Sequence, residues 1–107
     1  MVNLEPVVGS EQGQMRPVLV LSSSALNGLL PVVNAAPITS RKANRRVYRN
    51  EALLPAGTAG LPMESIVLCY QIRALDKRRL GRFFGLLTDV ALQEAVMEAL
   101  KYQLVFT

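Results

Sequence analysis

The feature that most constrains the fold is the unbroken apolar run Val18-Leu19-Val20-Leu21, which directly follows Arg16-Pro17. A continuous run of branched apolar residues is typical of a strand that is buried on both faces, as in a barrel or between layers. The preceding segment, Gly9-Ser10-Glu11-Gln12-Gly13, is polar and flanked by glycines, and it predicts a loop that lasts to Met15. A polar loop that leads into a buried strand is therefore expected here.

The rest of the chain predicts a small, mostly β domain of about five to six strands with a C-terminal helix, an α+β fold. Besides the strand at 16–22, strands are expected at 1–4 (the end of one), 30–36, 47–53, 65–75 and 81–87. A short helical turn is expected at 25–29, capped by one of the serines in Ser22-Ser23-Ser24. Pro37 should stop the strand at 30–36, and turns should fill 39–46, 55–62 and 76–79.

The C-terminal segment predicts a helix that begins after Thr88 or Asp89 and lasts to about Tyr102. Its apolar side chains recur every four residues, which predicts one buried stripe made of Leu92, Val96, Leu100 and Leu104.

Length and composition indicate one domain that spans residues 1–107, since a chain of 107 residues has no room for two cores. No apolar run reaches the roughly 18 residues that span a bilayer, and no secretory signal is visible, so we expect a cytoplasmic protein without a membrane partner. The single Cys69 fits a reducing compartment. We expect it to be a small buried hydrophobe.

The basic residues are clustered. Lys and Arg number 12 against 8 Asp and Glu, a net charge of +4. Ten of the 12 cations lie in two runs: Arg41, Lys42, Arg45, Arg46 and Arg49, then Arg73, Lys77, Arg78, Arg79 and Arg82. Such clusters favour a phosphate-rich or acidic partner, although either run alone is also compatible with a solvated loop.

The chain contains no histidine, which removes the usual general base and most zinc sites. Its acidic residues show no metal-ligand spacing, and no phosphate-binding glycine loop is present. The remaining Arg, Glu, Thr, Ser and Gln residues can bind a phosphodiester and stabilise charge that develops on it. Arg16 and Thr39, with Glu11 nearby, could serve a metal-free ribonuclease, because RNA supplies its own nucleophile; an Arg before a proline-led strand is also often only structural.

Three segments together resemble the MazF/PemK (Kid-like) toxin family. They are Gly9-Ser10-Glu11-Gln12-Gly13 with Arg16-Pro17-Val18-Leu19-Val20, then Pro37-Ile38-Thr39-Ser40, then the segment from Ser65 to Leu80. The resemblance implies a small SH3-like barrel of the MazF/PemK/CcdB plasmid-maintenance-toxin type and a homodimer. It also implies a metal-independent, sequence-specific endoribonuclease without a cofactor, which cleaves single-stranded mRNA to a 2′,3′-cyclic phosphate and is neutralised by an antitoxin with an acidic, flexible segment.

The resemblance also implies roles for single residues. Arg16 would bind the phosphate and transfer a proton or stabilise the phosphorane, Thr39 would contact the scissile phosphate, and Glu11 would act as base or orient Arg16. The substrate-binding candidates are Ser10, Gln12, Ser40, Arg41, Arg45, Arg46 and Gln71.

The chain departs from the family pattern in two ways. The Arg and Asp that the Kid branch uses in the third segment correspond to Leu68 and Tyr70 here, so only the Arg16/Thr39 version is available. Relatives also begin with an additional stretch, so part of the first strand is expected to be absent, which would leave an edge unpaired. The alternatives are a gyrase poison with the same fold, in the manner of CcdB-like proteins, and a shortened, inactive toxin that still binds its antitoxin.

Overall fold

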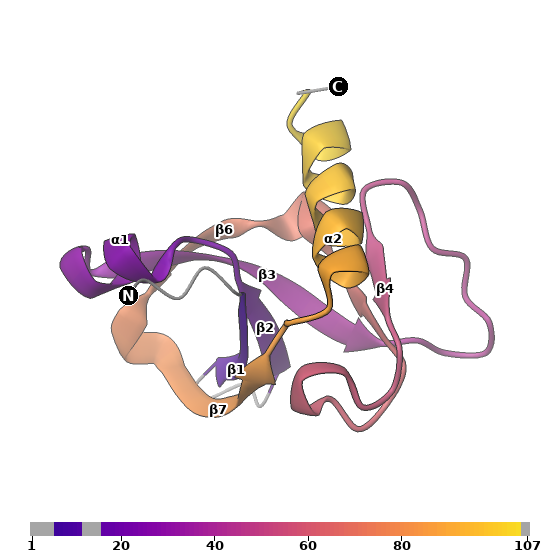
Figure 1. The fold of residues 1–107 in the computed structure, drawn as a ribbon, viewed down its shortest axis with the longest axis horizontal. Helices are drawn as coiled ribbons and strands as arrows, with labels where there is room; N and C mark the ends of the chain where they lie inside the picture. The colour runs from indigo at the N-terminus through magenta and orange to yellow at the C-terminus, as the bar shows by residue number, and fades with distance from the viewer. Residues whose placement is uncertain (1–5, 12–15, 106–107) are drawn as a thin grey trace.

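The computed structural model describes residues 6–11 and 16–105. Within them, seven strands form an antiparallel sheet with the order β4-β5-β3-β2-β1-β7, and β6 is paired to β3. The helix α2 packs beside β4, whereas α1 projects from the opposite end of the molecule (Figure 1). In chain order the elements are β1 (Val7–Glu11), β2 (Arg16–Val20), α1 (Ser24–Leu29), β3 (Val32–Ser40), β4 (Ala52–Leu54), η1 (Thr58–Gly60), β5 (Ser65–Val67), η2 (Cys69–Gln71), β6 (Arg73–Asp76), η3 (Lys77–Arg79), β7 (Leu80–Leu86) and α2 (Val90–Gln103). The prediction of a mostly β fold with a C-terminal helix is confirmed.

The long strand β3 is the centre of the sheet. One edge pairs with β2, and the other pairs with β6 over its first half and with β5 over its last three residues. The prediction that Pro37 stops this strand is wrong. Pro37 lies where the ladder to β2 ends, so its missing N–H costs little, and its carbonyl oxygen accepts from the Leu68 N–H at 2.9 Å.

The strand β1 occupies residues that were predicted to be a loop. It pairs with β2 on one side and with β7 on the other, so it is not an edge of the sheet. Gly9 permits the close approach to β7, because a Cβ there would lie 2.9 Å from the carbonyl oxygen of Arg82. Pairing on both sides therefore overrides the polar, glycine-rich composition. The predicted strand end at 1–4 and the loop at 12–15 lie outside the described residues.

Two other predicted strands are shorter than expected. The predicted strand 65–75 is interrupted by the 3₁₀ turn η2, which separates β5 from β6 so that both reach the same edge of β3. The predicted strand 47–53 is reduced to β4, because the backbone before it turns to bring Glu51 to Arg45. Both helix starts are confirmed: Ser23 caps α1, and Asp89 accepts from the Leu92 N–H at the start of α2.

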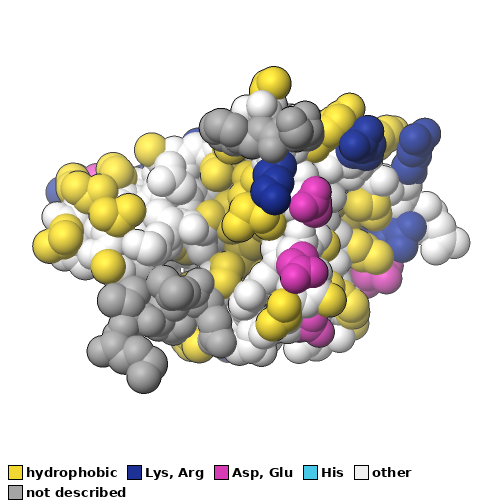
Figure 2. All heavy atoms as spheres, turned by 45° about the horizontal axis from the view of Figure 1, so that its top comes forward, with side chains coloured by type: hydrophobic (Ala, Val, Ile, Leu, Met, Phe, Trp, Pro, Cys, Tyr) yellow, Lys and Arg dark blue, Asp and Glu magenta, His cyan; other side chains and the backbone are white. Residues whose placement is uncertain are grey.

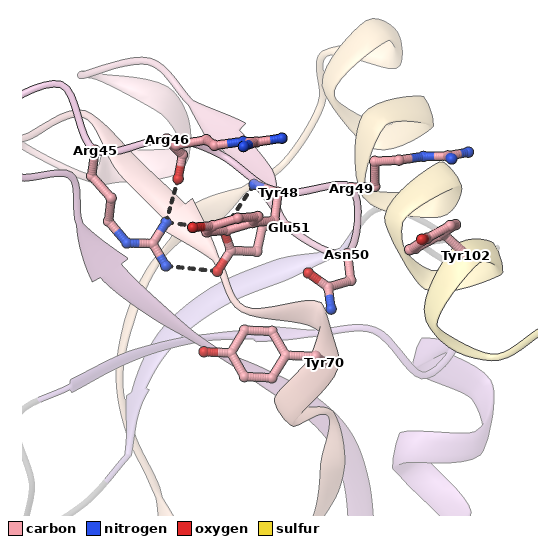
Figure 3. A pocket seen from close by; sticks show the side chains of 8 residues that line it. All are labelled: Arg45, Arg46, Tyr48, Arg49, Asn50, Glu51, Tyr70 and Tyr102. Carbon is pink, nitrogen blue, oxygen red and sulfur yellow. Dashed lines mark hydrogen bonds and ion pairs between the residues drawn. The ribbon is translucent and has the colours of Figure 1, made fainter.

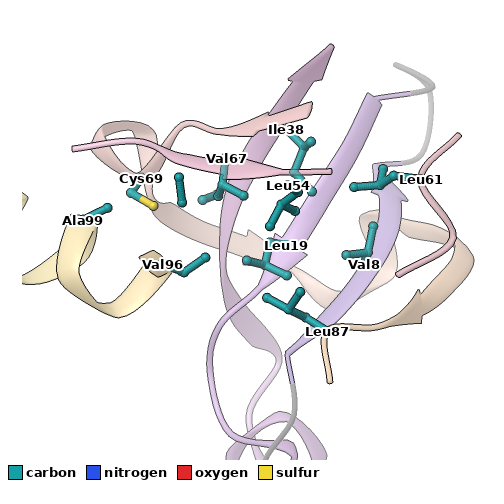
Figure 4. Close-up of a cluster of buried hydrophobic side chains, with 12 residues drawn as sticks. Val8, Leu19, Ile38, Leu54, Leu61, Val67, Cys69, Leu87, Val96 and Ala99 are labelled. Atoms are coloured by element: carbon teal, nitrogen blue, oxygen red, sulfur yellow. The ribbon is translucent and has the colours of Figure 1, made fainter. Parts of the chain in front are cut away.

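The main hydrophobic core lies between the sheet and α2 (Figure 4). Its fully buried members include Leu19, Leu54 and Leu87. Of the predicted helix stripe, Val96 is buried and Leu92 and Leu100 pack against the core. Leu104, however, follows the end of α2 and is exposed, so that part of the prediction is wrong.

A second, smaller cluster covers the other face of the sheet. It consists of Val18, Val20, Val33, Ala35 and Leu75. Alternate residues of a strand point to opposite faces, so Val18 and Val20 enter this cluster while Leu19 enters the main core. The prediction that the run at 18–21 is buried on both faces is confirmed. No helix among the described residues is long and apolar enough to cross a membrane.

Candidate active site and nucleic-acid interface

Three predicted catalytic residues come from neighbouring strands. Glu11 and Arg16 are direct cross-strand partners in the ladder between β1 and β2. In the next ladder Val18 faces Pro37, where the pairing of β2 with β3 ends, and alternation along β3 places Thr39 on the same face as Pro37. Directly opposed residues project from the same face of a sheet. Glu11, Arg16 and Thr39 therefore lie on the face that carries the smaller apolar cluster.

Glu11 is a buried carboxylate between two arginines. Its residue surface is only 3% exposed. One oxygen, Oε2, accepts from Nη2 of Arg73 at 2.6 Å, and the other, Oε1, lies 3.9 Å from Nη2 of Arg79. Arg73 and Arg79 are both open to solvent on their other side. These contacts fix the position of the Glu11 carboxylate, which pairs with two guanidinium groups, those of Arg73 and Arg79.

Arg73 and Arg79 were not among the predicted site residues. Their signal in the sequence was the second basic run, but charge alone did not indicate which of its members meet Glu11. Sixty-two residues separate Glu11 from Arg73, and only the pairing of β6 with β3 brings them together.

The predicted polar contacts occupy different places. The Ser10 hydroxyl accepts from the backbone N–H of Arg82 at 2.9 Å, at the irregularity between β1 and β7, so it has a structural bond. Thr39 is half-buried at the end of β3, and Ser40 beside it is exposed. Gln71 is exposed in η2. Gln12 lies outside the described residues.

The first basic run forms the loop 41–51, and two of its arginines are held by carboxylates. Nη1 of Arg41 lies 3.3 Å from Oε1 of Glu64. Arg45 forms a bidentate pair with Glu51, at 2.9 and 2.8 Å, and the Tyr48 N–H adds a third bond to Glu51 at 3.1 Å. The bonds from Arg45 hold the pKa of the Glu51 carboxyl below its usual value, despite burial that acts in the opposite direction.

The same loop forms the wall of a pocket of about 500 Å³ (Figure 3). Its lining consists of three arginines, three tyrosines and two further polar residues: Arg45, Arg46, Tyr48, Arg49, Asn50, Glu51, Tyr70 and Tyr102. The guanidinium of Arg46 lies 5.1 Å from the ring centre of Tyr48, and that of Arg49 lies 4.2 Å from the ring centre of Tyr102. Arg45 and Arg46 were candidates from the sequence, whereas the tyrosines were missed, because they are brought together from three separate segments.

Exposed apolar side chains gather at the α1 end of the molecule, which the second basic run also reaches, since the Lys77 N–H donates to the Pro31 carbonyl oxygen at 2.9 Å. In Figure 2, hydrophobic side chains gather at the end formed by α1, where Leu26, Leu29 and Leu30 are exposed. Several Lys and Arg side chains lie toward the other end, where loop 41–51 is found in Figure 1. On η3, Arg78 binds Asp76 in two places and lowers the pKa of that carboxyl to about 2.

Cys69 is fully buried, and burial raises the pKa of its thiol to about 12. A thiol of this kind is not a nucleophile at neutral pH, so the prediction that Cys69 is a buried hydrophobe is confirmed. Within the part of the chain that the structure describes, no three His, Cys, Asp or Glu side chains come together as metal ligands.

The chain is similar to known toxins over almost its whole length. Residues 1–104 match the family model described as PemK-like, MazF-like toxin of type II toxin-antitoxin system. A protein named endoribonuclease MazF from Staphylococcus saprophyticus is 35% identical over 94 residues, which cover 88% of this chain and 78% of that protein. The M. tuberculosis toxin MazF-mt6 superposes with a TM-score of 0.78 at 26% identity, covering 94% of this chain and 96% of that chain. A MazE–MazF structure from Deinococcus radiodurans gives a TM-score of 0.71 at 30% identity, covering 97% and 96%. These similarities confirm the predicted fold type and the family resemblance.

Proposed function

The chain belongs to the PemK-like, MazF-like toxins of type II toxin–antitoxin systems, and on that premise we propose that it is a sequence-specific endoribonuclease of single-stranded mRNA. The similarity to the protein named endoribonuclease MazF supports the activity. The observation that carries the proposal is the cross-strand pair of Glu11 and Arg16 on the face toward which Thr39 projects.

In the proposed reaction the RNA 2′-hydroxyl oxygen attacks the adjacent phosphorus and loses its proton. The bond from phosphorus to the 5′ oxygen of the next nucleotide breaks, and that oxygen takes up a proton, which leaves a 2′,3′-cyclic phosphate and a 5′-hydroxyl. Charge accumulates on the phosphoryl oxygens in the transition state, where preorganised cationic donors stabilise it. The reaction needs no metal if these donors supply that stabilisation.

The arrangement supports separate roles for the three residues. Arg16, exposed at the start of β2, would contact the phosphoryl oxygens and stabilise the phosphorane or deliver a proton. The Thr39 hydroxyl would hold the scissile phosphate. Glu11 would take the proton from the 2′-hydroxyl or orient Arg16; its bond to Arg73 favours the orienting role, because that bond occupies Oε2.

The proposed partners follow from the family and from the charge. A MazE–MazF assembly is known for the Deinococcus relative, and the two basic runs of this chain suit an antitoxin segment that is acidic and flexible. A second copy of the chain would complete a homodimer, and the cytoplasm is the compartment that holds the mRNA substrate.

The test is an incubation of the purified protein with a long RNA in EDTA, followed by mapping of the cleavage ends. We expect cleavage at defined sites with cyclic-phosphate ends, and loss of at least roughly 100-fold in rate for Arg16→Ala, the usual scale for one transition-state donor. Lys101→Ala is the charge control, because Lys101 lies on α2, outside both basic runs, and pairs only weakly with Glu98 at 3.6 Å. Absence of cleavage by the wild-type protein, or full activity of Arg16→Ala, would refute the proposal.

A further inference from the structure

The pocket beside loop 41–51 is lined by tyrosines to which the proposed reaction assigns no role. All three tyrosines of the chain line it: Tyr48, Tyr70 and Tyr102. They come from the loop, from η2 and from α2, so three segments that are distant in sequence converge there. A volume of about 500 Å³ lies within the range of small-ligand sites.

The tyrosine side chains are partly open to solvent, although Arg46 and Arg49 lie over one face of Tyr48 and Tyr102. The exposed fractions of Tyr48, Tyr70 and Tyr102 are 53%, 42% and 44%. An aromatic ring contributes most free energy when another group covers it, so a ligand that stacks on these rings would be stabilised. Figure 3 shows the side chains of Arg46 and Arg49 extended in the same direction. Arg45, in contrast, is turned toward Glu51 and neutralises it. The pocket therefore combines three partly exposed tyrosine rings with two cations, Arg46 and Arg49, that lie over the rings of Tyr48 and Tyr102.

We propose that this pocket is a nucleotide subsite for the single-stranded RNA substrate, at which an unpaired base stacks on the tyrosines and the adjoining phosphates bind Arg46 and Arg49. Stacking on aromatic side chains together with cationic contacts to the backbone is the usual way in which proteins hold unpaired nucleotides. This inference rests on the ribonuclease function proposed above.

The position of the pocket in the chain supports the same substrate. β3 ends at Ser40, immediately after Thr39, and the loop that forms the pocket wall begins at the next residue. The pocket lining begins at Arg45, five residues after Ser40, so one short loop connects the strand that carries Thr39 to the pocket. An acidic peptide would pair with the two arginines, but its carboxylates would not stack on the three exposed rings.

The tyrosines also supply the measurement. The chain has no tryptophan, so its intrinsic fluorescence comes from these three side chains alone. The probe is a labelled, fully 2′-O-methylated RNA of mixed sequence and about 12 nucleotides, which lacks the nucleophilic hydroxyl. Its anisotropy gives the dissociation constant, and tyrosine emission reports stacking.

We expect the RNA to quench the tyrosine emission of the wild-type protein. Tyr48→Ala and Tyr102→Ala should each weaken binding by roughly fivefold or more, whereas Tyr48→Phe and Tyr102→Phe, which keep the ring, should remain within about twofold. Arg49→Gln should lower the slope of log affinity against log salt by about 0.7. Because the two tyrosines are exposed, the variants should fold, and circular dichroism checks this.

Several results would overturn the subsite: no binding of the RNA, binding without quenching, equal loss for Ala and Phe variants, or equally tight binding of a glutamate peptide of the same length. The last result would assign the pocket to an acidic segment. Unchanged affinity of the tyrosine variants in a protein that still cleaves RNA refutes the subsite alone. Quenching by RNA in a protein that cleaves nothing refutes the ribonuclease alone.

Discussion

The substitution Glu51→Gln tests whether Arg45 has a structural role, distinct from the RNA binding that we propose for Arg46 and Arg49. The Glu51 side chain is only 1% exposed, and its two oxygens accept three hydrogen bonds, two from Arg45 and one from the Tyr48 N–H. The amide of glutamine has one acceptor oxygen, so its NH₂ group would face a guanidinium N–H, donor against donor.

The expected loss follows from these contacts. A hydrogen bond to a charged group contributes about 1.5–3 kcal/mol, and an unsatisfied buried donor has a similar cost. Arg45 is about one-third exposed, so water can satisfy its displaced N–H. We therefore expect Glu51→Gln to lower the free energy of unfolding by about 2 kcal/mol, which moves the urea midpoint by roughly 1 M.

The assay is urea unfolding at several pH values, with Glu64→Gln as the matched control. Glu64 also pairs with an arginine, but its side chain is 47% exposed, so that variant should lose less than about 1 kcal/mol. Because pairing lowers the pKa of Glu51 in the folded protein, its contribution is complete above the unfolded value near 4.3. It is lost as the pH falls through the lower folded value, so the two proteins should converge in acid.

RNA affinity provides the second readout. Glu51→Gln removes a negative charge from the pocket lining, so RNA binding should be retained or strengthened while stability falls. Equal loss in the Gln variants of Glu51 and Glu64, or weaker RNA binding at unchanged stability, would refute the structural role that we assign to Arg45.

Three further perturbations test the packing and the catalytic face. Gly60→Ala should lower the free energy of unfolding by more than about 1 kcal/mol. The φ of Gly60 is +80°, and a Cβ there would lie 2.5 Å from a backbone carbonyl oxygen of β7. Gly28→Ala is the control: a Cβ there meets nothing within 4 Å, so the same assay should show unchanged or higher stability. Cys69 should resist iodoacetamide at pH 8 in the folded protein and react fully in urea, followed by mass spectrometry, since its thiol pKa is about 12; rapid alkylation without denaturant would contradict this. Arg73→Met should lower the free energy of unfolding by about 1–3 kcal/mol and slow RNA cleavage, because it leaves the buried Glu11 without its closest donor; cleavage at the wild-type rate would argue against a positioning role.

The sequence was sufficient where the determinants are local. The apolar run of β2, the Ser23 and Asp89 caps and the amphipathic α2 each depend on neighbours within a few residues, and all are present. The errors at β1 and β3 share a different cause. Both strands gain their hydrogen bonds from segments far away in the chain, and such pairing overrides the turn preference of Gly9 and the break expected at Pro37.

The same distinction applies to the site. Arg16 and Thr39 were chosen as candidates because such side chains can handle a phosphodiester; Arg16 begins β2 as expected, whereas Thr39, expected in a turn, lies in β3. Arg73 could not be selected from its run, because only the ladder between β3 and β6 decides which cation reaches Glu11. The tyrosine pocket depends on three segments at once, and none of them carries a local signal for it.

β3 determines how far function and stability can be separated in this molecule. Ile38 is fully buried in the main core, while its neighbour Thr39 points to the opposite face. A shift of the register by one residue would move Ile38 out of the core and Thr39 into it, so such a shift would disturb the core and the candidate site together. After Ser40 the chain leaves the sheet, and the loop is held by the pair of Arg45 and Glu51. Changes at the exposed Tyr48 should therefore alter RNA binding without altering the fold.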